Sequence, residues 1–216
     1  MTSINEHFTF QYSQPDEYHF SHDSVFFARS VYELTKSESL AGKNLLDLCC
    51  GCGIIGLDYL YHRFKEAMDL PTSVNFFDVQ TEFEPHIHAN IKRSGLPLKK
   101  TEVTLRNYAS DSTERSMNCY DLILCNPPYF HSRNGKLGAS TVRNRCHFFL
   151  DSSFKELIQF MIASLTKNGR SYFLSRDSKD HGEDLRKLLT QLCDTTATWT
   201  EMPQIRGTLM FQITKF

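Results

Sequence analysis

A short corner in the chain places an amide, two prolines and an aromatic ring next to one another. Asn126-Pro127-Pro128-Tyr129 directly follows the apolar run Tyr120–Cys125. Two consecutive prolines continue neither a strand nor a regular helix, so the backbone must turn rigidly here. The amide oxygen of Asn126 and the carbonyl of Pro127 could accept hydrogen bonds from a planar amine while Tyr129 stacks on the attached ring. The corner thus predicts a binding site for a flat amine.

A glycine-rich turn earlier in the chain has the spacing of a cofactor-binding loop. Gly51, Gly53 and Gly56 form a G-x-G-x-x-G pattern after the apolar run 44–50. Glycines at these positions permit a tight turn and let a ligand approach bare backbone. Asp78 ends the next apolar run, where a carboxylate can bond both hydroxyls of a ribose. The two features predict a cofactor that contains adenosine, and both NAD and S-adenosylmethionine fit.

An acid inside the first apolar run helps to choose between these cofactors. Asp47 lies close to the glycine turn among apolar residues. A buried carboxylate needs a compensating partner, either backbone N–H groups of the loop or an ammonium group on the ligand. NAD would bring a pyrophosphate here, which the carboxylate would repel, whereas S-adenosylmethionine brings its amino-acid end. Asp47 therefore favours S-adenosylmethionine, although bonding to local backbone alone stays open.

The corner and the glycine turn together are suited to methyl transfer. An amine conjugated to a ring or carbonyl is a poor nucleophile because its lone pair is delocalised. Hydrogen bonds accepted from its two N–H groups can twist it toward tetrahedral geometry. Transfer from a sulfonium then requires the lone pair to lie in line with the methyl carbon, at about 3–3.5 Å. No general base with a tuned pKa is required, because the proton can leave after the methyl arrives.

An alternation of strand and helix patterns predicts the fold that positions these residues. Buried strands are expected at 44–50, 73–79, 102–106, 120–125 and 170–175, with helices at 24–34, 54–65, 82–93, 152–165 and 181–192. This order predicts right-handed crossovers and a doubly wound, mostly parallel α/β sheet. The final runs, 195–201 and 208–215, are too close for a crossover helix and should pair antiparallel at one edge. Ligands of such sheets bind beyond the carboxyl ends of the strands.

The bulk composition is that of an ordinary globular protein. Hydrophobic residues are 40% and charged residues 23%, and the formal net charge is -1. We treat residues 1–216 as a single domain, with residues 1–40 as an N-terminal extension and helix that pack on it. No apolar run reaches the eighteen or so residues of a membrane span, and the start lacks a signal-peptide pattern. A cytoplasmic protein, monomeric by default, is therefore expected.

The cysteines and histidines do not form a convincing metal site. Cys49 and Cys52 make a C-x-x-C, but the sequence holds no second pair of that kind. Two histidine pairs, H-x-x-H from residue 19 and H-x-H from residue 86, also lack partners at suitable spacing. We predict no metal and small thiols that pack around a turn.

A basic stretch follows the corner. Between residues 131 and 147, Arg133, Lys136, Arg143 and Arg145 occur without any acid. Cations beside the target site would attract phosphates and make binding depend on salt. This favours RNA or DNA over a protein glutamine as the substrate, although a solvated loop without function stays an alternative.

These motifs resemble a known family over nearly the whole chain. D-L-C-C-G-C-G, F-D-V-Q and N-P-P-Y resemble the class I S-adenosylmethionine-dependent methyltransferases of the amino type. Those enzymes methylate exocyclic amines of adenine or guanine, or a glutamine amide, and their seven-stranded sheet ends in an antiparallel pair. The opening F-T-F-Q-Y and H-F-S-H-D-S-V-F-F-A are similar to the start of bacterial tRNA adenine methyltransferases. That subgroup modifies the N6 amine of an adenosine in the anticodon loop of a valine tRNA.

The resemblance implies a role for each matching position. The cofactor would be held by Asp23, Asp47, Cys49, Gly51, Gly53, Asp78, Val79, Asn107 and Asn126. The target would be held by Asn126, Pro127, Pro128 and Tyr129. Phe130 and the four loop cations would contact RNA. Within the cofactor group, the glycine loop would line the methionine end, Asp78 would take the ribose and Val79 would pack on the adenine.

The sequence also departs from the family pattern. Cys49 stands where a glycine is common, and Asp78 is one carbon shorter than the usual glutamate. Asn107 offers no carboxylate to the adenine amine, and residues 145–148 match the Arg-His-Glu run of the tRNA subgroup only in part. The substrate therefore stays open among adenine N6, guanine N2 and a glutamine amide, and a relative without turnover is a further alternative.

Overall fold

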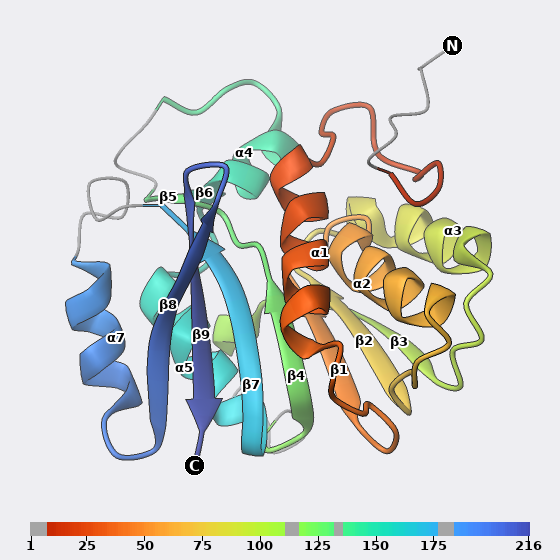
Figure 1. The fold of residues 1–216 in the computed structure, drawn as a ribbon. Coiled ribbons are helices and arrows are strands. Elements are labelled where there is room, and N and C mark those ends of the chain that lie inside the picture. Colours follow the sequence, from red (N-terminus) through yellow and green to blue (C-terminus); the bar gives the residue numbers. More distant parts are fainter. Residues whose placement is uncertain (1–7, 111–116, 132–135, 177–183) are drawn as a thin grey trace.

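A seven-stranded sheet forms the centre of the protein (Figure 1). The computed structural model describes residues 8–110, 117–131, 136–176 and 184–216. In chain order the strands of this sheet are β1 (Asn44–Leu48), β2 (Ser73–Asp78), β3 (Thr101–Leu105), β4 (Tyr120–Cys125), β7 (Leu165–Ser175), β8 (Ala197–Ile205) and β9 (Thr208–Lys215). They lie in the order β3-β2-β1-β4-β7-β9-β8. A separate pair of short strands, β5 (Phe130–His131) and β6 (Phe148–Phe149), follows the corner.

The strand directions confirm the predicted fold class. The five strands from β3 to β7 are parallel, whereas β9 runs antiparallel to both β7 and β8. The strand order reverses between β1 and β4, since the chain first builds outward to β3 and then returns to place β4 on the other side of β1. Ligands of doubly wound sheets bind at such a reversal, beyond the carboxyl ends of the strands.

Helices cover both faces of the sheet (Figure 1). One face carries α1 (His22–Thr35), α2 (Ile54–Lys65) and α3 (Glu84–Ser94), and the other carries α5 (Phe154–Ser164) and α7 (Leu185–Cys193). The described residues also form the 3₁₀ turns η1 (Thr81–Phe83) and η2 (Tyr108–Ser110) and the short helix α4 (Thr141–His147). Local signals fix several helix ends: Ser153 and Glu156 form a capping box at α5, and Gly95 ends α3 at φ 63°.

Side chains of the parallel strands alternate between two cores. Along β1, Leu45 packs with the α1–α3 layer, whereas Leu46 and Leu48 pack with α5 on the opposite face. Along β2, Phe76 and Phe77 divide in the same way. Because both faces are covered, these strands are apolar on both sides, which explains the continuous apolar runs in the sequence.

The structure corrects several predicted boundaries. The region 131–147 was expected to be a loop, yet it contains α4, whose N-cap Ser140 accepts a hydrogen bond from the Arg143 amide. Strand β7 begins at Leu165, so the predicted start of this strand at residue 170 is wrong. Helix α1 begins at His22 rather than at the predicted residue 24, so Asp23 lies in its first turn.

Among the described residues, no helix combines the length and apolar character required to cross a bilayer.

Candidate functional site

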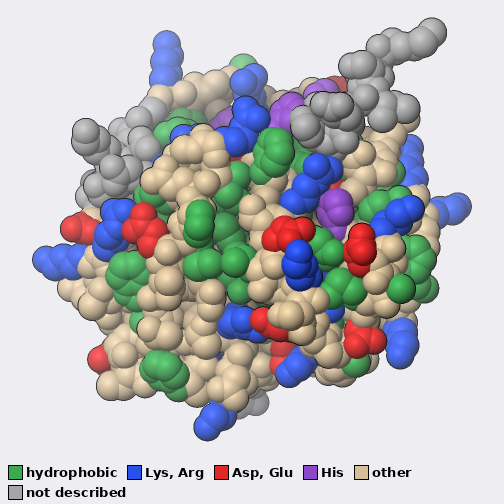
Figure 2. Space-filling view, viewed as in Figure 1, with side chains coloured by type: hydrophobic (Ala, Val, Ile, Leu, Met, Phe, Trp, Pro, Cys, Tyr) green, Lys and Arg blue, Asp and Glu red, His purple; other side chains and the backbone are tan. Residues whose placement is uncertain are grey.

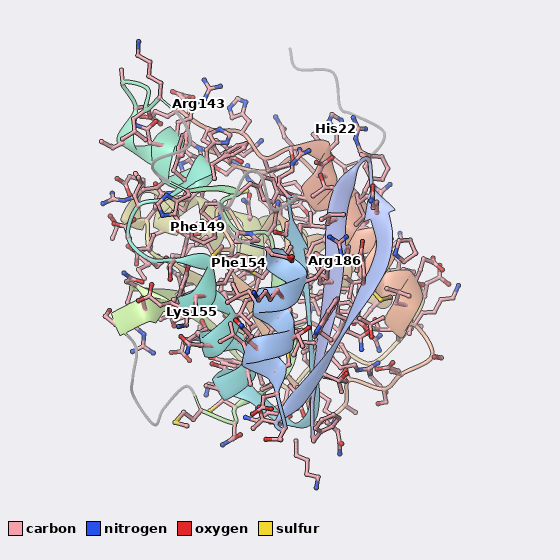
Figure 3. All side chains as sticks on the ribbon, turned by 90° about the vertical axis from the view of Figure 1, so that its left-hand side faces the viewer. His22, Arg143, Phe149, Phe154, Lys155 and Arg186 are labelled. Atoms are coloured by element: carbon pink, nitrogen blue, oxygen red, sulfur yellow. The ribbon has the colours of Figure 1, made fainter. Side chains whose placement is uncertain are left out.

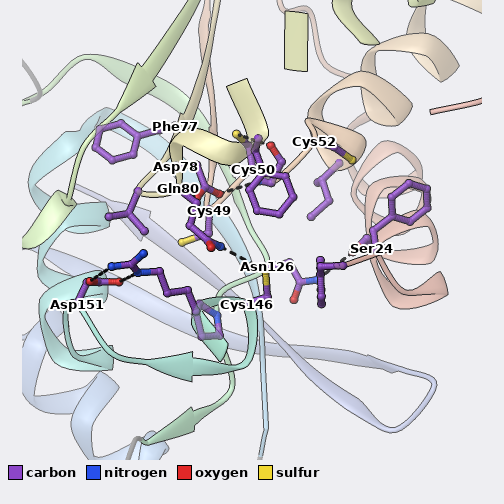
Figure 4. A pocket seen from close by; sticks show the side chains of 18 of the residues that line it. Ser24, Cys49, Cys50, Cys52, Phe77, Asp78, Gln80, Asn126, Cys146 and Asp151 are labelled. Atoms are coloured by element: carbon purple, nitrogen blue, oxygen red, sulfur yellow. Dashed lines mark hydrogen bonds and ion pairs between the residues drawn. The ribbon is translucent and has the colours of Figure 1, made fainter. Parts of the chain in front are cut away.

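A pocket opens at the carboxyl ends of β1, β2 and β4 (Figure 4). Its empty volume is about 910 Å³, which includes space that is open to solvent. Its walls come from the N-terminal segment, the glycine turn, the end of β2, the corner after β4 and residues 145–152. Phe83 of η1 and Tyr108 of η2 also line the pocket. A cavity therefore lies at the point where the strand order reverses.

The glycine turn and the proline corner meet in this pocket. Gly51 and Asn126 both line it, together with Asp78 and Pro128. Neighbouring strands bring them together, since Leu48 at the end of β1 is paired with Cys125 at the end of β4. The geometric condition for the predicted chemistry, two loops within one ligand's length at one sheet edge, is therefore met.

The side-chain amide of Asn126 is held from both ends. Its Nδ2 donates to Ser24 Oγ at 3.0 Å, and its Oδ1 accepts from the Tyr129 hydroxyl at 2.5 Å. Burial raises the pKa of Tyr129, so its hydroxyl keeps the proton that it donates. An amide oxygen has two lone pairs, so Oδ1 can accept one more hydrogen bond while it keeps Tyr129. Asn126 is thus a fixed acceptor at the mouth of the pocket.

The glycine turn has a backbone that suits glycine at three positions. Cys49, Gly51 and Gly53 have φ values of 56°, 52° and 81°. The left-handed region is unfavourable for a residue with a side chain, which explains why a glycine is common at the position of Cys49. Cys49 nevertheless occupies it and lines the pocket. The prediction that this side chain faces the ligand space is consistent with its placement.

Asp78 ties the end of β2 to the glycine turn. Its Oδ2 accepts from the Gly51 amide at 2.8 Å and its Oδ1 from the Gln80 amide at 2.9 Å. Burial raises the pKa of Asp78, and the backbone N–H groups oppose that rise. Each carboxylate oxygen retains a lone pair, so the residue can still accept hydrogen bonds from ligand hydroxyls.

Asp47 is buried beneath the pocket rather than in its lining. Its Oδ2 accepts from the Gly56 amide at 2.8 Å, and its Oδ1 has no hydrogen-bond partner among the described residues. A Cβ at position 56 would lie 2.9 Å from Oδ2, so Gly56 is required for this contact. Burial raises the pKa of Asp47 well above its usual range. Of the two compensating partners that the sequence left open, the structure supplies the backbone N–H.

We predict that Asp47→Asn stabilises the cofactor-free protein at pH 8. A raised native pKa means that the wild type loses stability as pH rises from about 4 through that pKa, because ionisation in the buried site is unfavourable. Asn keeps an oxygen for the Gly56 amide, and its NH₂ replaces an oxygen that already lacks a partner. The melting temperature should exceed that of the wild type by at least about 2 °C at pH 8. The difference should vanish near pH 4, and an equal difference at both pH values would contradict the prediction.

The other end of the pocket is closed by a bridge between residues 107 and 151. Asn107 Nδ2 donates to the Asp151 carbonyl at 2.6 Å, and its Oδ1 accepts from the Ala109 amide at 2.9 Å. The Asp151 carboxylate pairs with Arg145 at 2.9 and 3.3 Å. Val79 is 36% exposed beside them, an apolar surface that a ligand ring could cover. Arg145 therefore faces the pocket with its charge already matched.

Several predicted site residues lie outside the pocket lining. Asp23 accepts from Thr208 Oγ1 at 3.1 Å and pairs with Arg206 at 3.3 Å, which ties α1 to the β8–β9 hairpin. The lining also does not include Gly53 (the N-cap of α2), Pro127, Tyr129 and Phe130 (the first residue of β5). Figure 3 shows Arg143 and His22 at the same end of the molecule.

The predicted RNA-contacting cations divide between the rim and the pocket wall. Lys136 and Arg143 are exposed near α4, and Arg133 lies outside the described residues. Figure 2 shows basic and histidine side chains along the upper part of the face viewed, above the sheet end that holds the pocket.

Sequence reasoning missed three residues at the site. Tyr18 and Ser24 reach the pocket from the N-terminal segment and α1, and Arg176 lies beside the corner after β7. For Arg176 the available signal was its position directly after a parallel strand next to β4. The first two come from a segment whose place in the fold no local pattern indicates.

Four thiols gather around the pocket: Cys49, Cys50, Cys52 and Cys146. Burial raises the pKa values of Cys52 and Cys146 to about 12 and that of Cys50 well above its usual range. Cys50, Cys52 and Cys146 are therefore protonated packing groups at neutral pH. Within the described ranges, no group of three or more His, Cys, Asp or Glu side chains is arranged to bind a metal.

Comparison with known proteins gives relatives of one kind. A tRNA1(Val) (adenine(37)-N6)-methyltransferase from Photorhabdus laumondii is 25% identical over 127 residues, or 59% of this chain. This alignment spans only 48% of that protein, so the chain matches about half of its length.

Two solved structures share the fold. A candidate rRNA methylase from Clostridium thermocellum has a TM-score of 0.61 and 12% identity, over 87% of this chain and 96% of that one. A candidate S-adenosylmethionine-dependent methyltransferase from Streptococcus mutans has a TM-score of 0.58 and 15% identity, over 86% of this chain and 48% of that one.

The match to a protein family covers more of the chain than the match to the tRNA methyltransferase does. The description "Methyltransferase small domain" matches residues 19–192, which include the glycine turn, Asp78, the corner and α5. This span is most of the chain, and it confirms the assignment that the motifs predicted. The protein belongs to the methyltransferase small domain family.

Proposed function

We propose that the protein transfers a methyl group from S-adenosylmethionine to the N6 amine of an adenine in tRNA. The observation that carries this proposal is the meeting of Gly51 and Asn126 in one pocket. A cofactor loop and a planar-amine acceptor at one sheet edge are the two parts that the reaction requires.

The residues of the pocket fit the cofactor. The turn at Gly51 exposes backbone to the methionine end, and Asp78 retains lone pairs for ribose hydroxyls. Val79 offers an apolar surface to the adenine, and Asn107 offers an amide beside it. When bound, S-adenosylmethionine supplies an electrophilic methyl on a positively charged sulfur.

The corner would prepare the acceptor. Asn126 Oδ1 and the Pro127 carbonyl accept from the two N–H groups of the amine, which turns its lone pair away from conjugation with the ring. Tyr129 supports the ring while its hydroxyl holds the Asn126 oxygen in place. With S-adenosylmethionine bound, the nitrogen would form a bond to the methyl carbon as the bond of that carbon to sulfur breaks, and the extra proton would leave the amine for solvent.

Two observations support tRNA as the substrate. The curated relative methylates an adenine of tRNA1(Val), although the match spans about half of that protein. In this chain, Lys136 and Arg143 are exposed near the corner, where cations could contact phosphates. Arg145, which pairs with Asp151, supports the pocket wall instead.

The test is mass spectrometry of nucleosides from tRNA that has been incubated with the protein and labelled S-adenosylmethionine. The expected product is labelled N6-methyladenosine. Labelled N2-methylguanosine or methylglutamine in added protein would keep the chemistry and change the substrate. Binding of S-adenosylmethionine by calorimetry without transfer to any of these acceptors would indicate a relative that lacks turnover, and binding of NAD alone would reject the proposal.

We predict that Ser24→Ala lowers kcat about tenfold through Asn126. Ser24 fixes the orientation of the Asn126 amide by accepting from Nδ2, and loss of one hydrogen bond of about 1.4 kcal/mol corresponds to roughly this factor. Ser24→Thr, which keeps the hydroxyl, should restore most of the rate. If both variants lose activity equally while their melting temperatures fall, Ser24 acts through the stability of α1 instead.

A further inference from the structure

Arg176 lies against the ring of Tyr129. Its guanidinium carbon is 5.3 Å from the ring centroid. Strand β7 is parallel to β4, with Phe173 paired with Cys125, so the residues that follow these two strands emerge side by side. The pairing of these two strands therefore places Arg176 beside the proline corner.

The arrangement has the form of a closed stacking site. The separation of 5.3 Å allows direct cation–π contact, for which the limit is about 6 Å. A planar base between the two groups would require about 7 Å, which is two contact spacings of about 3.5 Å. An outward shift of the Arg176 side chain by about 2 Å would provide it, and this flexible side chain is half-buried rather than enclosed.

The opposite wall is fixed. Tyr129 is bonded through its hydroxyl to Asn126 and through its backbone amide to the His147 carbonyl at 3.1 Å. A ring that lies on Tyr129 would carry its exocyclic amine toward Asn126 Oδ1, since the two residues are in contact. The guanidinium plane of an arginine stacks on bases as aromatic rings do, and it also carries a charge that attracts RNA.

We propose that Arg176 forms the second wall of the target-base site, so that the base is held between Tyr129 and the Arg176 guanidinium. This inference rests on the proposed function and extends it, since it assigns a base-stacking role to a residue beyond the proline corner. It requires the plane of the guanidinium and not only its charge. Arg176→Lys is therefore the decisive substitution, because it keeps the charge and removes the plane.

The experiment measures binding of a single-stranded RNA oligonucleotide that contains one 2-aminopurine, with S-adenosylhomocysteine present. The same oligonucleotide with an abasic site at that position reports phosphate contacts alone. In the wild type, 2-aminopurine fluorescence should be quenched on binding. Arg176→Lys should weaken binding of the base-containing oligonucleotide about tenfold to a hundredfold and leave the abasic one nearly unchanged.

Arg143→Ala serves as the control, since it removes an exposed cation on α4. It should weaken both oligonucleotides by the same factor. If Arg176→Lys also affects both equally, or affects neither, the stacking role is rejected.

The proposed function is judged separately by nucleoside mass spectrometry. Absence of N6-methyladenosine with intact, Arg176-dependent quenching would reject the choice of substrate and keep the stacking site. Adenine methylation at the wild-type rate by Arg176→Lys would keep the function and reject the stacking role.

Discussion

Replacement of Asn126 by alanine should lower kcat for methyl transfer at least a hundredfold and leave the affinity for S-adenosylmethionine nearly unchanged. The amide oxygen is the acceptor that would bond the amine most strongly as its nitrogen becomes tetrahedral and positive. Loss of one such preorganised transition-state partner costs about a hundredfold to a thousandfold in other enzymes. Single-turnover kinetics with saturating tRNA and calorimetry with the cofactor measure the two quantities independently.

The contrast for this variant is Asn107→Ala at the other end of the same pocket. Asn107 bridges to the Asp151 carbonyl beside the surface proposed for the adenine of the cofactor. Its removal should raise the dissociation constant of S-adenosylmethionine with a much smaller change in kcat. If Asn126→Ala reduces cofactor affinity and turnover by the same factor, Asn126 is a cofactor-binding residue and its assignment to the amine is wrong.

The parts of the site that could be predicted from the sequence are those built by local backbone geometry. Two prolines after an apolar run and glycines after another must form turns, and the alternation of elements places both turns at the carboxyl ends of parallel strands. The mostly parallel sheet and its antiparallel edge pair are confirmed for the same reason. The assignment of residues 1–216 to one domain and the role of each predicted contact stay predictions.

What could not be predicted depends on contacts between distant segments. Ser24 is 102 positions away from its partner Asn126, so no local pattern links the two residues. Arg145 was predicted to be a free cation because its partner Asp151 lies beyond the basic stretch. Helix α4, which carries Arg145, brings this residue close to Asp151. The composition of the region did not indicate that helix.

The same dependence on distant contacts applies to a buried arginine outside the pocket. Arg63, on α2, is fully buried. Its guanidinium donates to the carbonyls of Thr35, Glu38 and Asp69 at 3.2, 2.7 and 3.0 Å. These bonds tie the end of α1 and the segment after it to the end of α2. Since α1 carries Ser24, the position of the Asn126 amide depends on this connection.

Arg63→Met should therefore reduce the free energy of unfolding by about 3–5 kcal/mol, which is the larger of the stability effects expected here. Methionine fills much of the volume but leaves carbonyls without the charged donor, and each hydrogen bond to a charged group contributes about 1.5–3 kcal/mol. Urea denaturation measures the change. Arg93→Met is the matched control, because Arg93 is exposed and, among the described residues, donates a hydrogen bond only to the Gln11 carbonyl, at 3.3 Å. It should change stability by less than about 0.5 kcal/mol.

If Arg63→Met lowers the free energy of unfolding and leaves kcat unchanged, Arg63 supports the fold alone. The connection through α1 predicts more: at a temperature where Arg63→Met is still folded, kcat should fall, because Ser24 would no longer hold the Nδ2 group of Asn126 at a fixed position. Cofactor affinity should change less, since Gly51 and Asp78 are joined directly to each other and not through α1. Equal stability of the Arg63 and Arg93 variants would mean that the three carbonyls find water on loss of the guanidinium, and the proposed link between this buried charge and the proline corner would then be rejected.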